Sequence, residues 1–221
     1  NGGLEEVHSP QTKLSKGKLD IKQTPIRLAI SGPAAAGNAI VKVSSDLNLP
    51  NLVGLDVGGT SSDIVVIRNG RLNESPMEER EIGGYPLQTP MLDLNTIGAG
   101  GGSLVQIDEY GVLHVGPQSA GAQPGPACYK RGGQLPTVTD AAVIAGRLPK
   151  GIKLGGNLSI YPELSEKVFT DQFSNSKKEI HSFALDILTL AESEIALAIR
   201  ERTVARGINP REMSLVAAGG A

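Results

Sequence analysis

Cysteine and aromatic residues are scarce in this sequence. Its 221 residues include one cysteine, no tryptophan, and aromatic residues at only 3% of positions. A single cysteine excludes an internal disulfide bond and favours a reducing compartment, so we expect a cytoplasmic protein. Because so few aromatic rings are available, the hydrophobic core is predicted to be aliphatic.

Long apolar runs and an excess of one charge are also missing. The apolar stretches fall far short of the roughly 20 residues that a membrane-spanning helix needs, and no signal peptide is recognisable, so no membrane association is expected. Basic and acidic residues nearly balance, at 21 and 23, and give a net charge of −2. That balance creates no field to attract nucleic acid. The pattern Gly-x-x-x-x-Gly-Lys-Ser/Thr is absent too, which excludes a P-loop protein.

Glycine, in contrast, is abundant. The sequence has 28 glycines and 14 prolines but no low-complexity repeat, so the glycines are expected at positions with a conformational requirement. Hydrophobic residues at 39% and charged residues at 20% are typical of a folded globular chain. The sequence starts without methionine and stops in an apolar run, so it reads as part of a longer protein.

The first half is predicted to form a strand and a helix, followed by three consecutive antiparallel strands. The lead-in consists of a strand at 26–30 and a helix at 33–46, with Ser31 as its cap. Two buried strands follow, at 52–57 and 64–67, and Asn69-Gly70 is typical of a type I′ turn into a third strand.

The second half is predicted to be a glycine-rich insert followed by helices. The insert, residues 73–136, contains one expected hairpin, at 103–116. Helices are predicted at 137–148, with Thr139 or Asp140 as cap, at 162–173 and at 182–206, before a buried strand at 214–218. This order indicates a mixed α/β fold rather than a Rossmann series.

The turn between the first two buried strands has an unusual polar composition. Residues 56–63 read Asp-Val-Gly-Gly-Thr-Ser-Ser-Asp. Gly58 and Gly59 allow backbone N–H groups to converge on an anion, and the hydroxyls of residues 60–62 (Thr60, Ser61 and Ser62) suit phosphate oxygens. Asp56 and Asp63 would repel such an anion unless a cation lies between, as Mg²⁺ does on a polyphosphate. A solvated turn stabilised by its own side chains is the simpler alternative.

Two further glycine groups indicate close backbone approach. The segment 98–103, Gly-Ala-Gly-Gly-Gly-Ser, is not a dinucleotide-binding fingerprint, because Ser103 stands at its last position and a strand follows. It predicts contact of backbone at Gly100 and Gly101 with either a ligand or another chain segment. Gly219 and Gly220 would let a flat ring lie against the end of the last strand.

The remaining candidate residues have weaker signals. Cys128 could act as a nucleophile, although a lone cysteine with no recognisable histidine partner is more often structural. The three histidines have no metal-ligand spacing. Asp140 could equally be a helix cap, and Asp93 could reach Mg²⁺ or substrate.

Several stretches together resemble the hydantoinase A / 5-oxoprolinase family, which also contains the ATP-hydrolysing subunits of acetone and acetophenone carboxylases. The stretches are GLDVGGTSSD, IGGYPLQTPMLDLNTIGAGGGS, GPQSAGAQPGPACYKRGG, PTVTDA and LVAAGGA. The resemblance covers nearly the whole chain. It implies the fold of the actin-like ATPases, which include actin and the sugar kinases, and in which two lobes hold ATP.

The resemblance assigns roles to particular residues. Asp56 to Asp63 match the second phosphate-binding hairpin of that superfamily, and Gly219 and Gly220 match the start of its adenosine motif. ATP and Mg²⁺ are therefore the implied cofactors, with Asp56 and Asp63 on the metal. Asn95 stands where relatives carry histidine, which puts a catalytic or metal-binding role for that position in doubt. Ser62 for threonine and Ala218 for phenylalanine are milder departures.

The resemblance also implies an organisation and an activity. The chain would be one ATP-binding lobe over residues 1–221. Its parts would be a lead-in at 1–50, the phosphate hairpin at 51–72, the insert at 73–136, and helices with the adenosine strand at 137–221. The activity would be ATP-dependent hydrolysis of a cyclic amide or imide through a phosphorylated substrate, in an oligomer and with a possible hydantoinase B-type partner subunit.

Three alternatives stay open at this point. The chain could belong to the ATPase subunit of a ketone carboxylase, to a small-molecule kinase of the same superfamily, or to a noncatalytic nucleotide-dependent assembly protein. This chain alone is expected to be inactive, because the first phosphate hairpin of the superfamily is not in it. The substrate, whether hydantoin, 5-oxoproline or a ketone, is left open.

Overall fold

The computed structural model describes residues 31–82, 84–86, 92–149, 151–174 and 178–220. The strand predicted at 26–30 lies outside these residues. The chain divides into two compact units, which are described separately. Unit 1 takes the described residues of Asn1–Asp56, Asp63–Asn95 and Arg200–Ala217, and unit 2 takes those of Val57–Ser62, Thr96–Ile199 and Ala218–Ala221.

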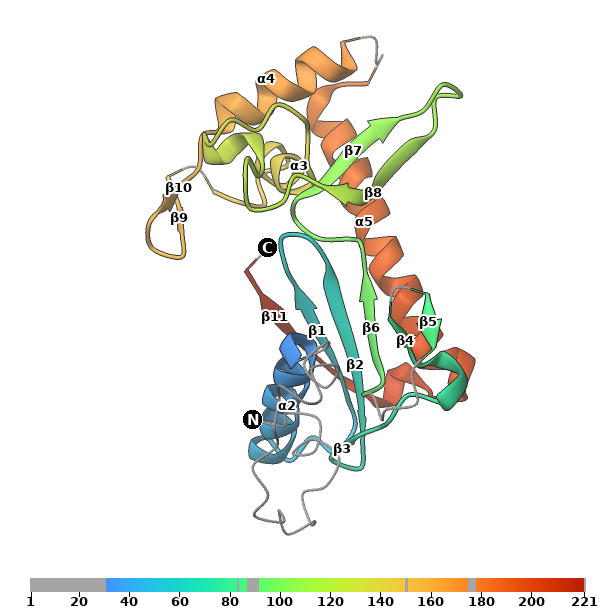
Figure 1. Cartoon of the computed structure of the whole chain (residues 1–221). Helices are drawn as coiled ribbons and strands as arrows, with labels where there is room; N and C mark the ends of the chain where they lie inside the picture. Colours follow the sequence, from blue (N-terminus) through green and yellow to red (C-terminus); the bar gives the residue numbers. More distant parts are fainter. Residues whose placement is uncertain (1–30, 83, 87–91, 150, 175–177, 221) are drawn as a thin grey trace. The chain divides into compact units, whose positions relative to one another are not determined.

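The strands of unit 1 form a five-stranded sheet, and the ends of four of them continue into unit 2 (Figure 1). Its members are β1 (Leu52–Val57), β2 (Ser62–Arg68), β3 (Arg71–Leu72), β6 (Leu94–Ile97) and β11 (Ser214–Gly219). The order is β11-β1-β2-β3, with β6 also paired to β2. Asn69 and Gly70 both have positive φ, at 52° and 73°, as a type I′ turn requires. The predicted run of three consecutive strands is confirmed.

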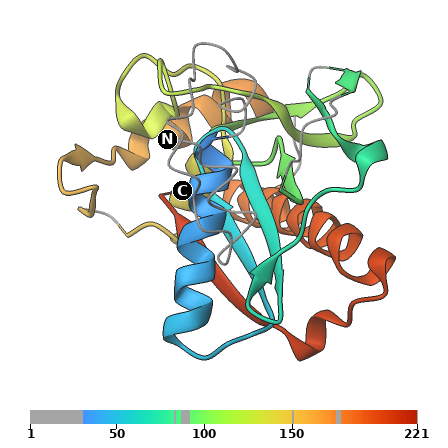
Figure 2. The same cartoon turned by 60° about the horizontal axis from the view of Figure 1, so that its bottom comes forward.

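Helix α2 (Ser31–Asp46) packs on this sheet, as Figures 1 and 2 show. Its Ile40 joins a cluster with Leu52, Val65 and Ile67 of β1 and β2. A Cβ at Gly54 would lie 2.2 Å from Ile40 Cδ1, so glycine is needed in β1 for the helix to approach. The predicted helix is present, and it begins at Ser31 rather than at residue 33.

The final strand differs from its prediction. We expected a buried strand at 214–218, but most of β11 is exposed, with Leu215 at 60%. The strand ends the path of the sheet, so β1 is its neighbour on one side. Only Val216 packs on the cluster around Leu52. Apolar residues alone cannot reveal whether another element covers a strand.

Unit 2 consists of a hairpin and three helices. The hairpin pairs β7 (Ser103–Ile107) with β8 (Leu113–Ser119), as predicted, and places Val105 opposite Val115. The helices are α3 (Val138–Ile144), α4 (Pro162–Phe173) and α5, whose range Ile180–Arg202 runs on into unit 1. Shorter strands are β4 (Glu81–Ile82) and β5 (Tyr85–Pro86), in unit 1, and β9 (Lys153–Leu154) and β10 (Leu158–Ser159), in unit 2. One-turn 3-10 helices are Met77–Glu79, Ala127–Tyr129, Val204–Arg206 and Pro210–Glu212.

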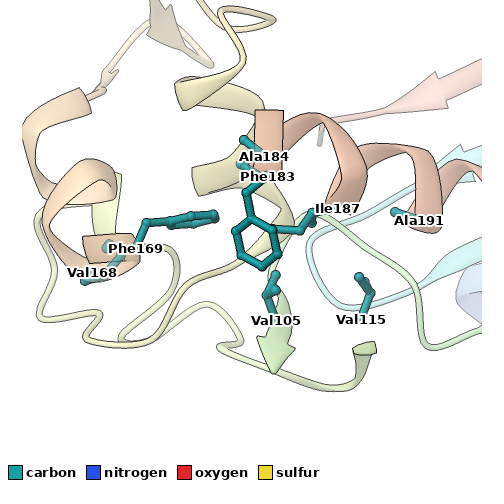
Figure 3. Packing of buried hydrophobic residues seen from close by; sticks show 10 residues of the cluster. Val105, Val115, Val168, Phe169, Phe183, Ala184, Ile187 and Ala191 are labelled. Carbon is teal, nitrogen blue, oxygen red and sulfur yellow. The ribbon is translucent and has the colours of Figure 1, made fainter. Parts of the chain in front are cut away.

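All three phenylalanines of the protein meet in the core of unit 2. Phe169 and Phe173 of α4 and Phe183 of α5 contact one another edge-to-face, with ring centroids 4.9–6.4 Å apart. Ile187 of α5 and Val105 of β7 pack against the same core (Figure 3). The phenylalanine rings are thus concentrated at one place in a core that is otherwise mostly aliphatic.

The boundaries of α3 and α5 differ from the predictions at both ends: α3 ends at Ile144 rather than at residue 148, and α5 begins at Ile180 rather than at residue 182. Helix α3 has Thr137 as its N-cap and Asp140 at the third position, which together form a capping box, so the expected cap at Thr139 or Asp140 was wrong by two or three residues. Helix α5 ends at Arg202 rather than at residue 206, because Thr203 departs from helical geometry with φ −118°. In the part of the chain that is described, no helix has the length and apolarity to cross a bilayer.

Candidate functional site

The turn at residues 58–61 joins β1 to β2. The Gly58 N–H donates to the Ser61 carbonyl at 2.9 Å, which closes the turn. Gly59 and Thr60 are exposed, and Ser61 is half-buried. From here on, the name phosphate hairpin is used for residues 58–61 alone, the turn of the segment 51–72 that the sequence predicts to bind phosphate.

Three consecutive amides of the phosphate hairpin are unpaired within the described part of the chain. Among the residues that the structure describes, the backbone N–H groups of Gly59, Thr60 and Ser61 find no hydrogen-bond acceptor. The Thr60 and Ser61 hydroxyls make no hydrogen bond with those residues either. Unpaired amides at an exposed turn are what an anion-binding concavity requires.

Two carbonyls of the same turn, those of Gly58 and Gly59, are occupied, and their partners come from residues 98–103, which we call the glycine loop. The Gly101 N–H donates to the Gly58 carbonyl at 3.0 Å, and the Gly102 N–H donates to the Gly59 carbonyl at 2.6 Å. A Cβ on Gly100 would lie 2.6 Å from the Gly58 oxygen, within backbone that cannot move aside. The glycine loop therefore approaches another chain segment closely, which was one of the two predicted possibilities.

Buried hydroxyls hold the glycine loop in place. Ser62 is fully buried and donates to the Ala99 carbonyl, so its hydroxyl supports the loop instead of facing outward as expected for a phosphate ligand. Ser103, also fully buried, donates to the Gly98 carbonyl at 3.0 Å and accepts from the Gly100 N–H at 2.8 Å.

A pocket of about 220 Å³ lies in unit 2 beside Gly220. Apart from two glycines, its wall is mostly aliphatic, and its polar side chains are Tyr129, Thr139 and Arg147. The full lining is Gly101, Tyr129, Val138, Thr139, Ala142, Arg147, Leu148, Leu154 and Gly220. Burial raises the pKa of the Tyr129 phenol, so this group stays protonated and can donate. The volume is below the roughly 300–1,000 Å³ of complete ligand sites and suits a single ring system.

Gly219 and Gly220 have different surroundings. A Cβ on Gly219, whose φ is 112°, would lie 2.1 Å from the Val57 carbonyl oxygen, so the end of β11 approaches the end of β1 too closely for a side chain. A Cβ on Gly220 would meet nothing within 4 Å. Only Gly220 lines the pocket.

The two predicted metal ligands flank the phosphate hairpin along the chain. Asp56 lies in β1 and Asp63 in β2, and both are half-buried. The Gly58–Ser61 hydrogen bond sets an antiparallel register in which these two residues stand opposite each other, on one face of the sheet. Like charges at directly opposite positions of a sheet repel each other.

Asp93 has other partners than those predicted. Its carboxylate is 6% exposed and binds Arg206 and, at 2.9 Å, Arg202. Both arginines also contact Glu79, and Arg202 donates to the Asn95 side chain at 3.4 Å. Burial raises the pKa of Asp93, although the positive charges of Arg206 and Arg202 act to lower it. These contacts, all within unit 1, tie the end of α5 and the segment after it to β6 and the residue before it.

Cys128 is fully buried in unit 2, in a cluster with Val143 and Ile160. Burial and the nearby Asp140 carboxylate raise the pKa of its thiol, so almost no thiolate forms at neutral pH.

We expect the native protein to leave Cys128 unmodified by a maleimide that labels it completely after denaturation, as measured by peptide mass spectrometry. Rapid labelling of the native thiol would revive the nucleophile hypothesis.

Asp140 is a buried anchor. Its carboxylate is fully buried and accepts five hydrogen bonds within unit 2, all at 2.7–3.2 Å. The donors are the Ala127, Cys128 and Thr137 amides and the Thr137 and Ser165 hydroxyls. This set matches the structural alternative that the sequence left open.

The side chains that line the pocket are not predicted by the sequence. No motif indicates a role for Tyr129 or Arg147, and the pattern around Thr139 predicts only a helix cap. The Thr137-x-x-Asp140 pattern of a capping box was the available signal for the start of α3. Nothing local in the sequence indicates that α3, the glycine loop and Gly220 share a pocket.

The chain matches the model of the hydantoinase/oxoprolinase family over residues 17–221. It is 36% identical to caprolactamase subunit alpha of Pseudomonas jessenii over 91% of this chain and 29% of that protein. It is 33% identical to the acetophenone carboxylase gamma subunit of Aromatoleum aromaticum, over 94% and 29%. For 5-oxoprolinase of Saccharomyces cerevisiae the identity is 34%, over 98% and 18%. The chain thus spans less than a third of the length of these relatives.

Solved structures agree with this relationship. The ATP-dependent caprolactamase from Pseudomonas jessenii superposes with a TM-score of 0.74 at 37% identity, over 86% of this chain and 28% of that one. Nucleotide-free acetone carboxylase superposes with a TM-score of 0.78 over 86% and 27%, and at 24% identity it supports the α/β fold alone. The chain belongs to the hydantoinase/oxoprolinase family.

Proposed function

We propose that this chain is the ATP-binding part of an enzyme that hydrolyses cyclic amides at the expense of ATP. The observation that carries the proposal is the set of three unpaired amides at Gly59, Thr60 and Ser61, on a turn whose Gly58 and Gly59 carbonyls are held by the glycine loop. The likeness to an ATP-dependent caprolactamase supports it. The actin-like lobe expected from the sequence is part of the same proposal.

The phosphate hairpin would bind the β- and γ-phosphates of ATP. Its amides are fixed before the ligand arrives, so they need no reorganisation to stabilise negative charge. The Thr60 and Ser61 hydroxyls would add donors, and Ser62 would act only through the glycine loop. Phosphoryl transfer depends mainly on such positioning and electrostatic stabilisation.

The pocket beside Gly220 would hold the adenine ring. Its aliphatic wall and the exposed glycine backbone suit a flat apolar ring, and the Tyr129 phenol and the Arg147 guanidinium are donors for ring nitrogens. Gly219 would contribute by letting β11 approach β1 rather than by touching the nucleotide.

Asp56 and Asp63 fit a magnesium ion that is shared with phosphate. Among the described residues no group of three or more His, Cys, Asp or Glu side chains could hold a metal by itself. Mg²⁺ in phosphoryl-transfer sites needs only one or two carboxylates, because phosphates and water complete its coordination. When bound, it would neutralise charge on the phosphates, while the two carboxylates orient it.

The reaction would activate an amide that otherwise resists water. The γ-phosphoryl group would move to the amide oxygen, with release of ADP. One water would add to the activated carbon, the C–N bond would break with a proton going to nitrogen, and a second water would release phosphate from the acyl phosphate. The balance is one ATP and two waters consumed for ADP, phosphate and a ring-opened amino acid.

Two relatives support a lactam-type substrate, and their names bear on assembly. Caprolactamase and 5-oxoprolinase are both named for cyclic amides, and the first is a subunit of a larger enzyme. We therefore propose that a partner subunit, of hydantoinase B type, completes this enzyme. A ketone carboxylase is the second candidate, since the acetophenone carboxylase gamma subunit is similar at nearly the same identity.

Substrate-stimulated ATP hydrolysis tests the proposal. The full-length protein, with and without its partner subunit, is incubated with caprolactam, 5-oxoproline, hydantoin, and acetophenone plus bicarbonate. We expect one cyclic amide to raise phosphate release at least about tenfold and to yield a ring-opened product without phosphate.

The control is a non-hydrolysable ATP analogue, which should support no ring opening. A bicarbonate-dependent ketone reaction would favour the carboxylase, and a phosphorylated product would indicate a kinase. Nucleotide-dependent association without stimulated hydrolysis would contradict an enzymatic role.

A further inference from the structure

The peptide unit between Gly101 and Gly102 is held at both ends. Its N–H, on Gly102, donates to the Gly59 carbonyl of the phosphate hairpin at 2.6 Å. Its C=O, on Gly101, accepts from the Thr139 amide at 2.7 Å and from the Thr139 hydroxyl at 2.8 Å. Because C=O and N–H of a trans peptide lie in one plane and point in opposite directions, Thr139 and the phosphate hairpin lie at opposite edges of this peptide unit.

The same rule sets the orientation of the peptide unit between Gly59 and Thr60 in the phosphate hairpin. The Gly59 carbonyl points toward the glycine loop, so the N–H of the same peptide unit, on Thr60, must point away from it. The Gly58 carbonyl, bound by the Gly101 amide, fixes the Gly59 N–H in the same manner. The orientation of the Gly59 and Thr60 amides thus depends on the glycine loop, and hydrogen bonds linked in a chain strengthen one another.

Thr139 is itself rigidly placed. It is 6% exposed and lies in the first turn of α3, between the N-cap Thr137 and Asp140 of the capping box. Its amide and its hydroxyl both donate to Gly101, 38 positions earlier in the chain, and its side chain also hydrogen-bonds with the Tyr129 phenol. Thr139 and Gly101 also line the pocket beside Gly220. The same threonine therefore borders the pocket and hydrogen-bonds to the glycine loop.

We propose that Thr139 is a positioning residue for the phosphate hairpin, acting through the Gly101–Gly102 peptide to aim the amides that receive the phosphates of ATP. The inference rests on the proposed function and extends it, because it connects the pocket to the phosphate end of the site. The buried Thr139 hydroxyl would affect phosphate binding only through the glycine loop and would not contact phosphate itself.

The test compares Thr139→Val, which removes the hydroxyl at nearly constant shape, with Thr139→Ser, which keeps it. Thr189→Val is the matched control, since the Thr189 hydroxyl also donates to a carbonyl, Leu185 at 2.9 Å, but on an exposed face of α5. Dissociation constants of ATP, ADP and adenosine are measured by calorimetry on the full-length protein, together with KM for ATP and kcat.

We expect Thr139→Val to weaken ATP and ADP binding about fivefold and adenosine binding less than about twofold, because one of two hydrogen bonds to the Gly101 carbonyl is lost. Thr139→Ser should restore the wild-type values, and Thr189→Val should not differ from wild type. Thr139→Ala is a second deletion of the hydroxyl, to be used if the valine variant fails to fold.

Three results would overturn the inference. Equal losses for adenosine and ATP would mean that Thr139 contacts the base and does not act on the hairpin. Equal losses in the valine and serine variants would mean that the hydroxyl is not responsible, and unchanged binding in all variants would remove any role. A wild-type protein that binds no ATP would refute the proposed function itself.

Discussion

Replacing Gly100 with alanine is expected to lower ATP-dependent turnover of the full-length protein about a hundredfold. The new Cβ would lie 2.6–2.8 Å from three backbone atoms of the phosphate hairpin, in residues 58, 60 and 61. Such overpacking costs about 1–3 kcal/mol and forces the hairpin to shift. A displacement of about 1 Å at a phosphoryl-transfer site is enough for a loss of this size. Steady-state kinetics and the thermal unfolding midpoint measure the two consequences.

Gly59→Ala separates packing from ligand binding. A Cβ at Gly59 would meet nothing within 4 Å, so this substitution should leave the unfolding midpoint unchanged. Its added methyl group would instead face the incoming phosphates, and the affinity for ATP should fall. A Gly100→Ala protein with wild-type turnover would show that the fit between the glycine loop and the hairpin is unimportant for the reaction.

Replacing Asp140 with alanine is expected to destabilise unit 2 by about 3–5 kcal/mol, because a fully buried carboxylate is removed from five donors that then have no partner. The three stranded amides belong to the first residues of the 3-10 helix at 127–129 and to the N-cap of α3. Amide hydrogen exchange in peptides from α3 and α4 should accelerate about a hundredfold or more.

Asp171→Ala provides the control, since Asp171 is exposed on α4 and lies in the same unit. Exchange in that variant should equal the wild-type rate. If Asp140→Ala exchanged no faster than Asp171→Ala, the carboxylate would not be the anchor that its contacts indicate, and a direct role in chemistry would need to be reconsidered.

Local signals made part of this structure predictable. A type I′ turn requires positive φ at both central positions, which Asn69 and Gly70 adopt readily, and Pro162 suits the first turn of a helix. The β2–β3 turn and helix α4 therefore follow from neighbouring residues alone. The composition of residues 56–63 predicts an anion site, and that part of the prediction still awaits the binding experiments. Short-range steric rules are sufficient for such features.

Other features depend on partners that are distant in the chain. Segment 98–103 could have met a ligand or protein, and only the fold shows that Gly100 packs on the hairpin some 40 residues earlier. Strand β11 looks buried by its residues, yet burial is decided by what covers it. Asp93 precedes the glycine loop in sequence, but its partners are Arg202 and Arg206, over 100 positions later. No spacing rule links such pairs.

The gathering of every phenylalanine at one contact has a practical consequence. In this chain, ¹⁹F-labelled phenylalanine would place its probes at 169, 173 and 183 and nowhere else. Their resonances would then report on the junction of α4 with α5 without interference from the rest of the chain. Ring-current shifts fall off steeply with separation, so a small loosening of these edge-to-face pairs would move all three signals together.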